Sequence, residues 1–179
     1  MTATVTRRDV HDITGRCWVM PQDYINTDSI MPRRGYDLPP HEQRMLVLQT
    51  VREGWAEQVR PGDILIAGRN FGTGSSRPAV TLLAQLGIVA LVGESISEIF
   101  FRNCVSYAMP ALELPGVLGM VTEGDTVSVD IGSGRFENVT TGQRAQGAAM
   151  PAALLETIAV GGAYVQLRAE GYMGQETGA

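Results

Sequence analysis

The sequence predicts an α/β fold built around a parallel sheet. Two apolar runs of strand length, 63–67 and 88–92, stand on either side of a segment, 79–86, in which alanine and leucine recur at helical spacing. A second helix is expected over about 95–105. This alternation of strand, helix, strand and helix is the pattern of a parallel crossover, which is right-handed in nearly all proteins.

The length and composition predict one domain. With 179 residues, of which 44% are hydrophobic, the chain can bury a substantial core, expected over about 15–168 and followed by a polar tail over about 170–179. No apolar run approaches the roughly 18 residues that cross a bilayer, and the N-terminus lacks the apolar centre of a secretory signal. We therefore expect a cytoplasmic protein without membrane association.

The elements before the central unit follow in order. A strand is predicted over 16–20, directly after Gly15, and a loop over 32–40 ends in two prolines. A helix is predicted over 42–59, because its apolar residues fall near one face.

The elements after the central unit are predicted from shorter patterns. The segments 126–130 and 135–139 flank a glycine-containing turn and predict a hairpin. A short helix is predicted over 151–160, and a last strand over 163–167.

The most informative segment is the glycine-spaced turn Asn70-Phe71-Gly72-Thr73-Gly74-Ser75-Ser76-Arg77. Ser76 is predicted to be the N-cap of the following helix, with Arg77 and Pro78 in its first turn. Backbone N–H groups at a helix start favour negative charge, so two hydroxyls and a guanidinium would converge on a bound anion. The same pattern also occurs in turns that only cap a helix. The segment lacks the lysine of a Walker A loop and the third glycine of a dinucleotide fingerprint.

Residue content limits the possible chemistry. All fourteen basic residues are arginines, which excludes aldolase and pyridoxal mechanisms that need a lysine. The net charge of −5 argues against nucleic acid as a partner. A dianionic substrate would need locally placed arginines, whose planar fork suits carboxylates. His11 and His41 give only weak support for a serine–histidine pair.

Four segments, 24–36, 60–70, 70–77 and 94–103, together carry a resemblance to a known family. In this order and near this spacing they resemble the small subunit of 3-isopropylmalate dehydratase, a unit that is also the swivelling domain of aconitase. The resemblance covers about 15–116. It implies a single swivelling β/β/α domain over the whole chain, with one parallel and one antiparallel sheet and helices on one side.

The resemblance also implies an activity, a cofactor and a partner. The family comprises hydro-lyases that isomerise 2-substituted malates by removing water and adding it back across a double bond. A 4Fe–4S cluster, held by a large subunit and not by the small one, acts as Lewis acid on the departing hydroxyl. The chain is therefore expected to act in leucine biosynthesis, only as a heterodimer with the large subunit, on a small di- or tricarboxylate.

The catalytic residues of the family fall on the glycine loop. Matched residue by residue, the family's base falls on Ser75, held as an alkoxide, and Ser76 and Arg77 fall on positions that hydrogen-bond the substrate carboxylate. Thr73 and Gly74 belong to the same loop and are expected beside the substrate. The helix terminus, the loop N–H groups and Arg77 would all stabilise an anion at Ser75.

The N-terminal segment supplies further candidates. Asp28 matches a carboxylate that helps to handle protons near the base. Arg33 and Arg34 lie in the family's substrate-recognition segment, and one of them is expected to pair with a substrate carboxylate. Without the resemblance, an exposed arginine is usually a solvated charge, and an aspartate before an apolar run often only caps a turn.

The sequence departs from the family pattern in three places. Thr73 stands for a cysteine, Pro78 and Ala79 stand for Glu-His, and 33–36 has Arg-Arg-Gly-Tyr where Arg-Tyr-Leu is more typical. The Gly-Ser-Ser-Arg motif is retained, so activity is expected. Two alternatives stay open: a substrate of the dimethylmalate, citramalate or homoaconitate type, or a non-catalytic swivelling domain that binds a partner.

The cysteine content yields a first prediction. The chain has two cysteines, Cys17 and Cys104, which are expected to be reduced packing residues and are too few to hold a cubane cluster. The purified chain should therefore be colourless, iron-free and inactive without its partner. Iron analysis and the visible spectrum check this, and stoichiometric iron with a cluster absorption band would contradict it.

Overall fold

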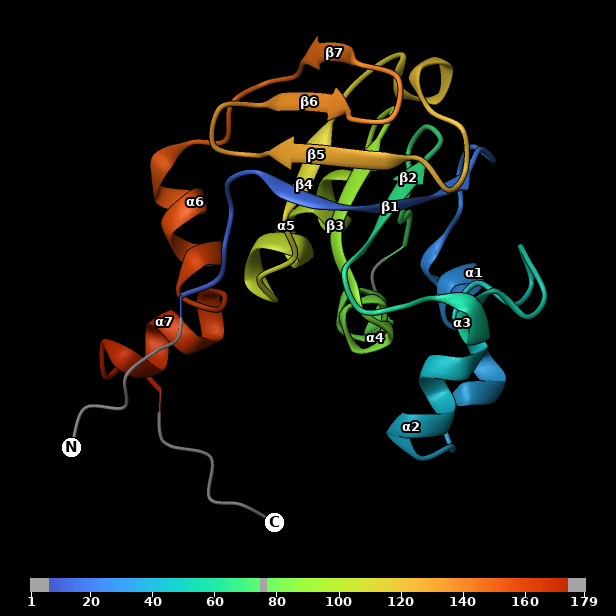
Figure 1. The fold of residues 1–179 in the computed structure, drawn as a ribbon. Coiled ribbons are helices and arrows are strands. Elements are labelled where there is room, and N and C mark those ends of the chain that lie inside the picture. The colour runs from blue at the N-terminus through green and yellow to red at the C-terminus, as the bar shows by residue number, and fades with distance from the viewer. Residues whose placement is uncertain (1–6, 75–76, 174–179) are drawn as a thin grey trace.

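The computed structural model describes residues 7–74 and 77–173 (Figure 1). One seven-stranded sheet has the order β4-β3-β2-β1-β5-β6-β7. The strands are β1 (Ile13–Met20), β2 (Asp63–Ala67), β3 (Ile88–Gly93), β4 (Ala111–Glu113), β5 (Thr126–Asp130), β6 (Arg135–Asn138) and β7 (Gln143–Gln146). The α-helices are α1 (Thr27–Ile30), α2 (Pro40–Gln43), α3 (Trp55–Gln58), α4 (Ala79–Leu86), α5 (Glu98–Ser106), α6 (Ala152–Ala159) and α7 (Ala163–Ala169). Short 3₁₀ turns cover Arg33–Gly35, Arg44–Leu46 and Val117–Met120.

Strand β1 joins a parallel and an antiparallel half of the sheet. Its C-terminal residues pair in parallel with β2, where Cys17 lies opposite Ile64, and its N-terminal residues pair with β5 in antiparallel fashion, where Ile13 lies opposite Val129. Strands β2, β3 and β4 continue the parallel half, and β5, β6 and β7 continue the antiparallel half. The predicted α/β class with a parallel and an antiparallel part is confirmed, as two halves of one continuous sheet.

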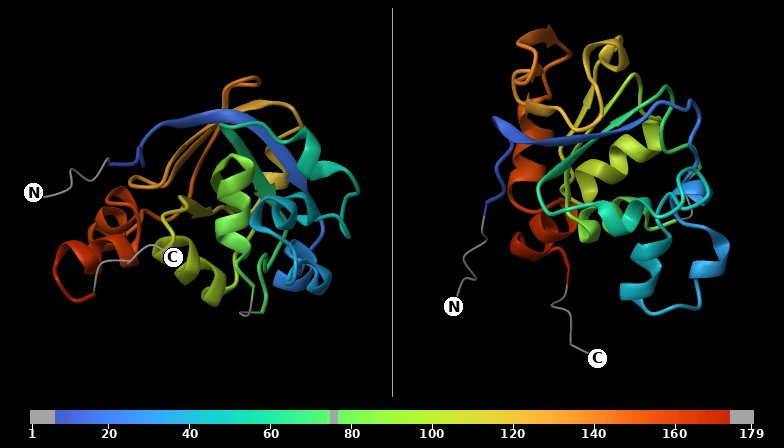
Figure 2. Two further views of the ribbon diagram at one scale, coloured as in Figure 1. Left: turned by 90° about the horizontal axis from the view of Figure 1, so that it is seen from below. Right: turned by 45° about the vertical axis from the view of Figure 1, so that its right-hand side comes forward.

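The parallel strands are buried on both faces. Leu65 and Ala67 of β2 contribute to a core shared with α4 and α5, whereas Ile64 and Ile66 contribute to a second core that includes Phe136 of β6. In Figures 1 and 2 the antiparallel strands and α4 lie on opposite sides of the parallel strands, which is the β/β/α layering. Burial on both faces explains why the parallel strands are nearly continuous apolar runs.

The predicted helix over 42–59 is wrong. The chain there forms the end of α2, a 3₁₀ turn and α3, because Leu48 and Gly54 have φ values of 56° and 69°, which a right-handed helix cannot contain. Leu48 and Trp55 are nevertheless fully buried. The apolar periodicity therefore marked some buried positions, although Met45 is exposed, and it did not correspond to one continuous helix.

The predicted last strand over 163–167 is also wrong, since this segment forms α7 and packs against α5 and α6. Five alternating residues are too few to separate a strand from a helix. The short strand β4 and the polar edge strand β7 were not predicted. The strands over 16–20, 63–67 and 88–92, the hairpin, and the helix over 151–160 are confirmed.

The predicted helix over 95–105 begins later, at Glu98. The side chain of Ser97 accepts a hydrogen bond from the N–H of Phe100 and so caps the N-terminus of α5.

Within residues 7–74 and 77–173, no helix is long and apolar enough to cross a membrane. The last part of the predicted polar tail, 174–179, lies outside the described residues, so the proposed domain limits stay a prediction.

Asp63, at the start of β2, is a buried polar anchor. Its carboxylate accepts hydrogen bonds from Nη2 of Arg16 at 2.6 Å, Nε1 of Trp18 at 2.7 Å and the N–H of Arg60 at 2.9 Å. Burial alone would raise the pKa of Asp63, but these hydrogen bonds outweigh burial and hold the pKa below its usual value. The ionised carboxylate thus stabilises the fold above its unfolded-state pKa, and this contribution is lost as the pH falls through the lower folded-state pKa.

Replacing Asp63 by Asn should lower the free energy of unfolding at pH 7 by about 1–3 kcal/mol, because the charge-assisted bonds to Arg16 are lost. Below about pH 4 the Asp63 carboxyl becomes protonated in the unfolded chain, and at still lower pH also in the folded protein, so the difference in stability between the native protein and the variant should narrow. Urea denaturation between pH 7 and pH 3 measures this, with Asp37→Asn at an exposed position as the control. If the free energies of unfolding of the native protein and of Asp63→Asn differed by the same amount at every pH, this account of Asp63 would be contradicted.

Candidate functional site

The candidate site lies where the chain leaves the carboxyl ends of β1 and β2. Asn26, which follows β1, and Thr73 of the glycine loop form a parallel backbone bridge. The N–H of Thr27 donates to the carbonyl of Thr73 at 2.7 Å, and the N–H of Gly72 donates to the carbonyl of Ile25 at 2.7 Å. The loop therefore continues the parallel pairing of β1 and β2 beyond the ends of the strands.

The other edge of the glycine loop is attached to the segment that begins α5. The N–H of Phe71 donates to the carbonyl of Ser95 at 3.1 Å, and the N–H of Ser97 donates to the carbonyl of Phe71 at 2.9 Å. The hydroxyl of Ser97 also donates to the carbonyl of Gly72 at 2.7 Å. Because Ser97 is the N-cap of α5, these bonds fix the loop to the helix.

Two positions in the loop require glycine. Gly72 has φ of 81°, and a Cβ atom there would lie 2.1 Å from Cγ of Phe100. Gly74 has φ of 91°, and a Cβ atom there would lie 2.7 Å from Oγ1 of Thr27. Both glycines therefore allow a close approach that any other residue would block.

The structure brings together two of the predicted site residues, Asp28 and Arg77. Asp28 lies in α1, and its Oδ1 accepts a hydrogen bond from Nε of Arg77 at 2.6 Å. The side chain of Arg77 is 8% exposed, whereas that of Asp28 is 65% exposed. A nearly buried cation is thus held at the end of the glycine loop by a carboxylate at the surface.

The aromatic partner of Arg77 was not predicted. Cζ of Arg77 lies 4.2 Å from the centroid of the Tyr36 ring, in cation–π geometry. Tyr36 directly follows the 3₁₀ turn Arg33–Gly35, and its N–H donates to the carbonyl of Arg33 at 3.1 Å. No local pattern pairs these two side chains, because they are far apart in the sequence.

The two arginines of the recognition segment differ in their surroundings. Nη2 of Arg34 donates to Oε1 of Gln49, so this guanidinium contacts the chain's own amide. Arg33 is exposed. Neither arrangement tests whether one of them pairs with a substrate carboxylate, which stays a prediction.

Ser75 and Ser76 lie outside the described residues, so their predicted roles in catalysis and substrate binding stay predictions.

The prediction that Ser76 is the N-cap of the helix after the loop is wrong, because α4 begins at Ala79 and its N-cap is Pro78. Arg77 therefore precedes the helix instead of lying in its first turn. The residue before a proline is disfavoured in helical conformation, which explains the later start. Helix α4 ends at its C-cap Gly87, which has φ of 111°.

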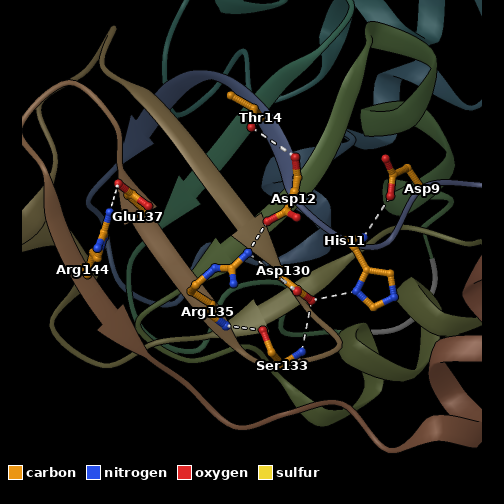
Figure 3. A network of polar contacts seen from close by, with 9 residues as sticks. All are labelled: Asp9, His11, Asp12, Thr14, Asp130, Ser133, Arg135, Glu137 and Arg144. Atoms are coloured by element: carbon orange, nitrogen blue, oxygen red, sulfur yellow. Dashed lines mark hydrogen bonds and ion pairs between the residues drawn. The ribbon is translucent and has the colours of Figure 1, made fainter.

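His11 belongs to a separate polar network near the start of β1 (Figure 3). Its Nδ1 lies 3.0 Å from Oδ1 of Asp130, which also accepts a hydrogen bond from the N–H of Ser133 at 3.0 Å. Burial alone would raise the pKa of Asp130, but these contacts outweigh it and lower the pKa. The network stabilises the turn between β5 and β6. His11 thus lies at the end of β1 opposite to the glycine loop, which disfavours a serine–histidine pair.

The two cysteines are packing residues, as predicted. Cys17 is buried in the core between the two halves of the sheet and Cys104 in the core on the helix side, and both are free thiols. Burial raises the pKa of the Cys17 thiol to about 11 and raises that of Cys104 as well. A 4Fe–4S cluster needs several thiolate ligands, so this donor set does not fit one. Over 7–74 and 77–173, no three His, Cys, Asp or Glu residues are grouped to hold a metal.

The layered sheet and the anchored glycine loop at the carboxyl ends of its parallel strands define an aconitase-type swivelling domain. A family model described as the aconitase C-terminal domain matches residues 22–116, which include Asp28, Tyr36 and the glycine loop. More particularly, the chain belongs to the 3-isopropylmalate dehydratase small subunit family.

Similar proteins extend over most of the chain. The 3-isopropylmalate dehydratase small subunit of Thermodesulfovibrio yellowstonii is 38% identical over 152 residues, covering 84% of this chain and 90% of the relative. The isopropylmalate/citramalate isomerase small subunit of Methanocaldococcus jannaschii is 35% identical with the same coverage. A crystal structure of 3-isopropylmalate dehydratase from M. jannaschii matches with a TM-score of 0.81 at 26% identity, over 89% of this chain and 95% of that one.

The close approach at Gly72 yields a prediction. Gly72→Ala should lower the free energy of unfolding by about 2–5 kcal/mol, because it adds backbone strain to a clash with the Phe100 ring. Gly54→Ala is the matched control, since Gly54 also has positive φ but no atom within 4 Å of its would-be Cβ. The free energy of unfolding of the control should fall by only about 1–2 kcal/mol, because this variant adds the backbone strain of positive φ without a clash. Equal losses in urea denaturation would show that the contact with Phe100 does not constrain the loop.

Proposed function

We propose that this chain is the small subunit of a two-component iron–sulfur hydro-lyase that isomerises a 2-substituted malate of the 3-isopropylmalate type. The reaction removes water and adds it back in the other orientation, as a step of leucine biosynthesis in the cytoplasm. The observation that carries the proposal is the pairing of Arg77 with Asp28 beside the glycine loop, within the matched segment. The names of the relatives support the same activity.

In the proposed mechanism the base takes a weakly acidic proton from the carbon next to a carboxylate, which a neutral serine cannot do. We assign this role to Ser75 as an alkoxide. Loop N–H groups and the guanidinium of Arg77 would stabilise that anion in a site from which water is excluded. Ser76 and Arg77 would hold the substrate carboxylate, and Asp28 would orient Arg77 and help to move the proton.

The remaining candidates would shape the substrate site. Thr73 and Gly74 belong to the part of the loop whose backbone is fixed beside α1, which supports a role in positioning the substrate. Of the two recognition arginines we favour Arg33 for a second carboxylate, since Arg34 is already engaged by Gln49. Such a contact would use the planar, permanently charged fork of arginine.

We assign the 4Fe–4S cluster to the large subunit, because the cysteines of this chain do not fit one. When bound there, the cluster would supply Lewis-acid assistance to the departing hydroxyl. The small subunit would contribute the base and the carboxylate-binding groups. This division supports a heterodimer as the active unit.

The substrate side group is the least constrained part of the proposal. Of the alternatives, a citramalate-type substrate has the support of the M. jannaschii relative, whose name includes citramalate. The retained Asp28 and Arg77, held in contact, favour catalysis over a purely partner-binding role.

Ser75→Ala, assembled with the large subunit, should lose turnover by about 10²–10⁴ while substrate affinity changes little, because a base acts only in the transition state. Ser76→Ala should instead weaken substrate binding and retain much of the turnover. Single-turnover kinetics and substrate affinity distinguish the two variants. Near-normal turnover by Ser75→Ala, or a collapse only in Ser76→Ala, would show that Ser75 is not the base.

A further inference from the structure

We propose that Tyr36 is a positioning residue: its ring and the carboxylate of Asp28 together orient the guanidinium of Arg77 so that its outer edge can bind a substrate carboxylate. The inference rests on the proposed function and adds Tyr36 to the site. It assigns a role to an aromatic residue in the segment 33–36, where this sequence departs from the family pattern.

Two contacts restrain the planar guanidinium in different directions. The ring of Tyr36 lies against the group, with its centroid 4.2 Å from Cζ of Arg77. The carboxylate of Asp28 binds the Nε edge at 2.6 Å. The first contact holds Cζ over the face of the tyrosine ring, and the second fixes the direction in which Nε points. Together they define the direction of the opposite edge, which carries Nη1 and Nη2.

This arrangement leaves hydrogen-bond donors for a ligand. Arginine has five N–H donors, and a cation–π contact uses none of them. Among the residues that the structure describes, the acceptor for Arg77 is Asp28, which binds only Nε. The two outer nitrogens match the spacing of the two oxygens of a carboxylate, with which arginine forms paired hydrogen bonds.

The position of Tyr36 follows from its local backbone. The turn begins at Pro32, where the N–H of Gly35 donates to the Pro32 carbonyl at 2.9 Å. Gly35 is buried, and a Cβ atom there would lie 3.2 Å from Cδ1 of Leu46. Because Gly35 has no side chain, the turn can pack closely against Leu46, while Tyr36 as a residue stays 46% exposed. Substitutions of Tyr36 should therefore alter the site without unfolding the protein.

The first arm of the test uses the enzyme assembled with its large subunit and 3-isopropylmalate. Tyr36→Leu should raise KM about threefold to tenfold, the range of a partly buried cation–π contact, and should change kcat by less than twofold. Tyr36→Phe should recover most of the lost affinity, since it retains the ring. Tyr172→Leu, at an exposed tyrosine in the C-terminal segment, is the matched control. An unchanged KM in Tyr36→Leu, or an equal loss in Tyr36→Phe, would overturn the role of the ring.

The second arm does not depend on turnover. In the full chain, NMR signals of the Arg77 side chain should show a ring-current shift that persists in Tyr36→Phe and disappears in Tyr36→Leu. If the native enzyme turns over no malate analogue, the proposed function fails, and this arm still decides the positioning inference. A shift that survives in Tyr36→Leu would overturn it.

Discussion

The candidate site depends on the close contact between Gly72 and the ring of Phe100. Phe100 packs edge-on against Phe71, with centroids 5.4 Å apart, and both rings are buried. Because Gly72 has no Cβ, the loop can lie directly on this aromatic pair and form backbone bridges on both of its edges. In its described part, the loop main chain is thus fixed by backbone bridges and by the hydroxyl of Ser97.

The surroundings of Arg77 illustrate how the fold keeps a charge in a nearly buried place. Removing a guanidinium from water is costly unless a carboxylate or another favourable contact compensates. Asp28 and Tyr36 provide such contacts from the segment that follows β1. Under the proposed function these residues form the anion-binding half of the site, and we assign the half that holds the cluster to the partner subunit.

Elements with a local signal could be predicted from the order of the amino acids. The strands over 63–67 and 88–92 were predictable because both faces of the parallel sheet are covered, which demands nearly unbroken apolar runs. The glycine loop was predictable as a special turn, because positive φ and close approach both require glycine. Arg77 was already a candidate from the glycine turn, but its role, and Asp28 as its neighbour in the site, came only through the ordered resemblance of several segments.

The positions at which helices break, and the side chains that meet, depend on long-range packing. Positive φ at Leu48 divides a segment whose periodicity fits one helix, and neighbouring helices set the conformation of 163–167. Asp28 and Arg77 are 49 residues apart, and the ring of Tyr36 reaches the same guanidinium from another turn. Such pairs depend on the path of the backbone through the parallel sheet. Local propensities describe the conformation of each segment, but only the packed chain fixes the distances between segments.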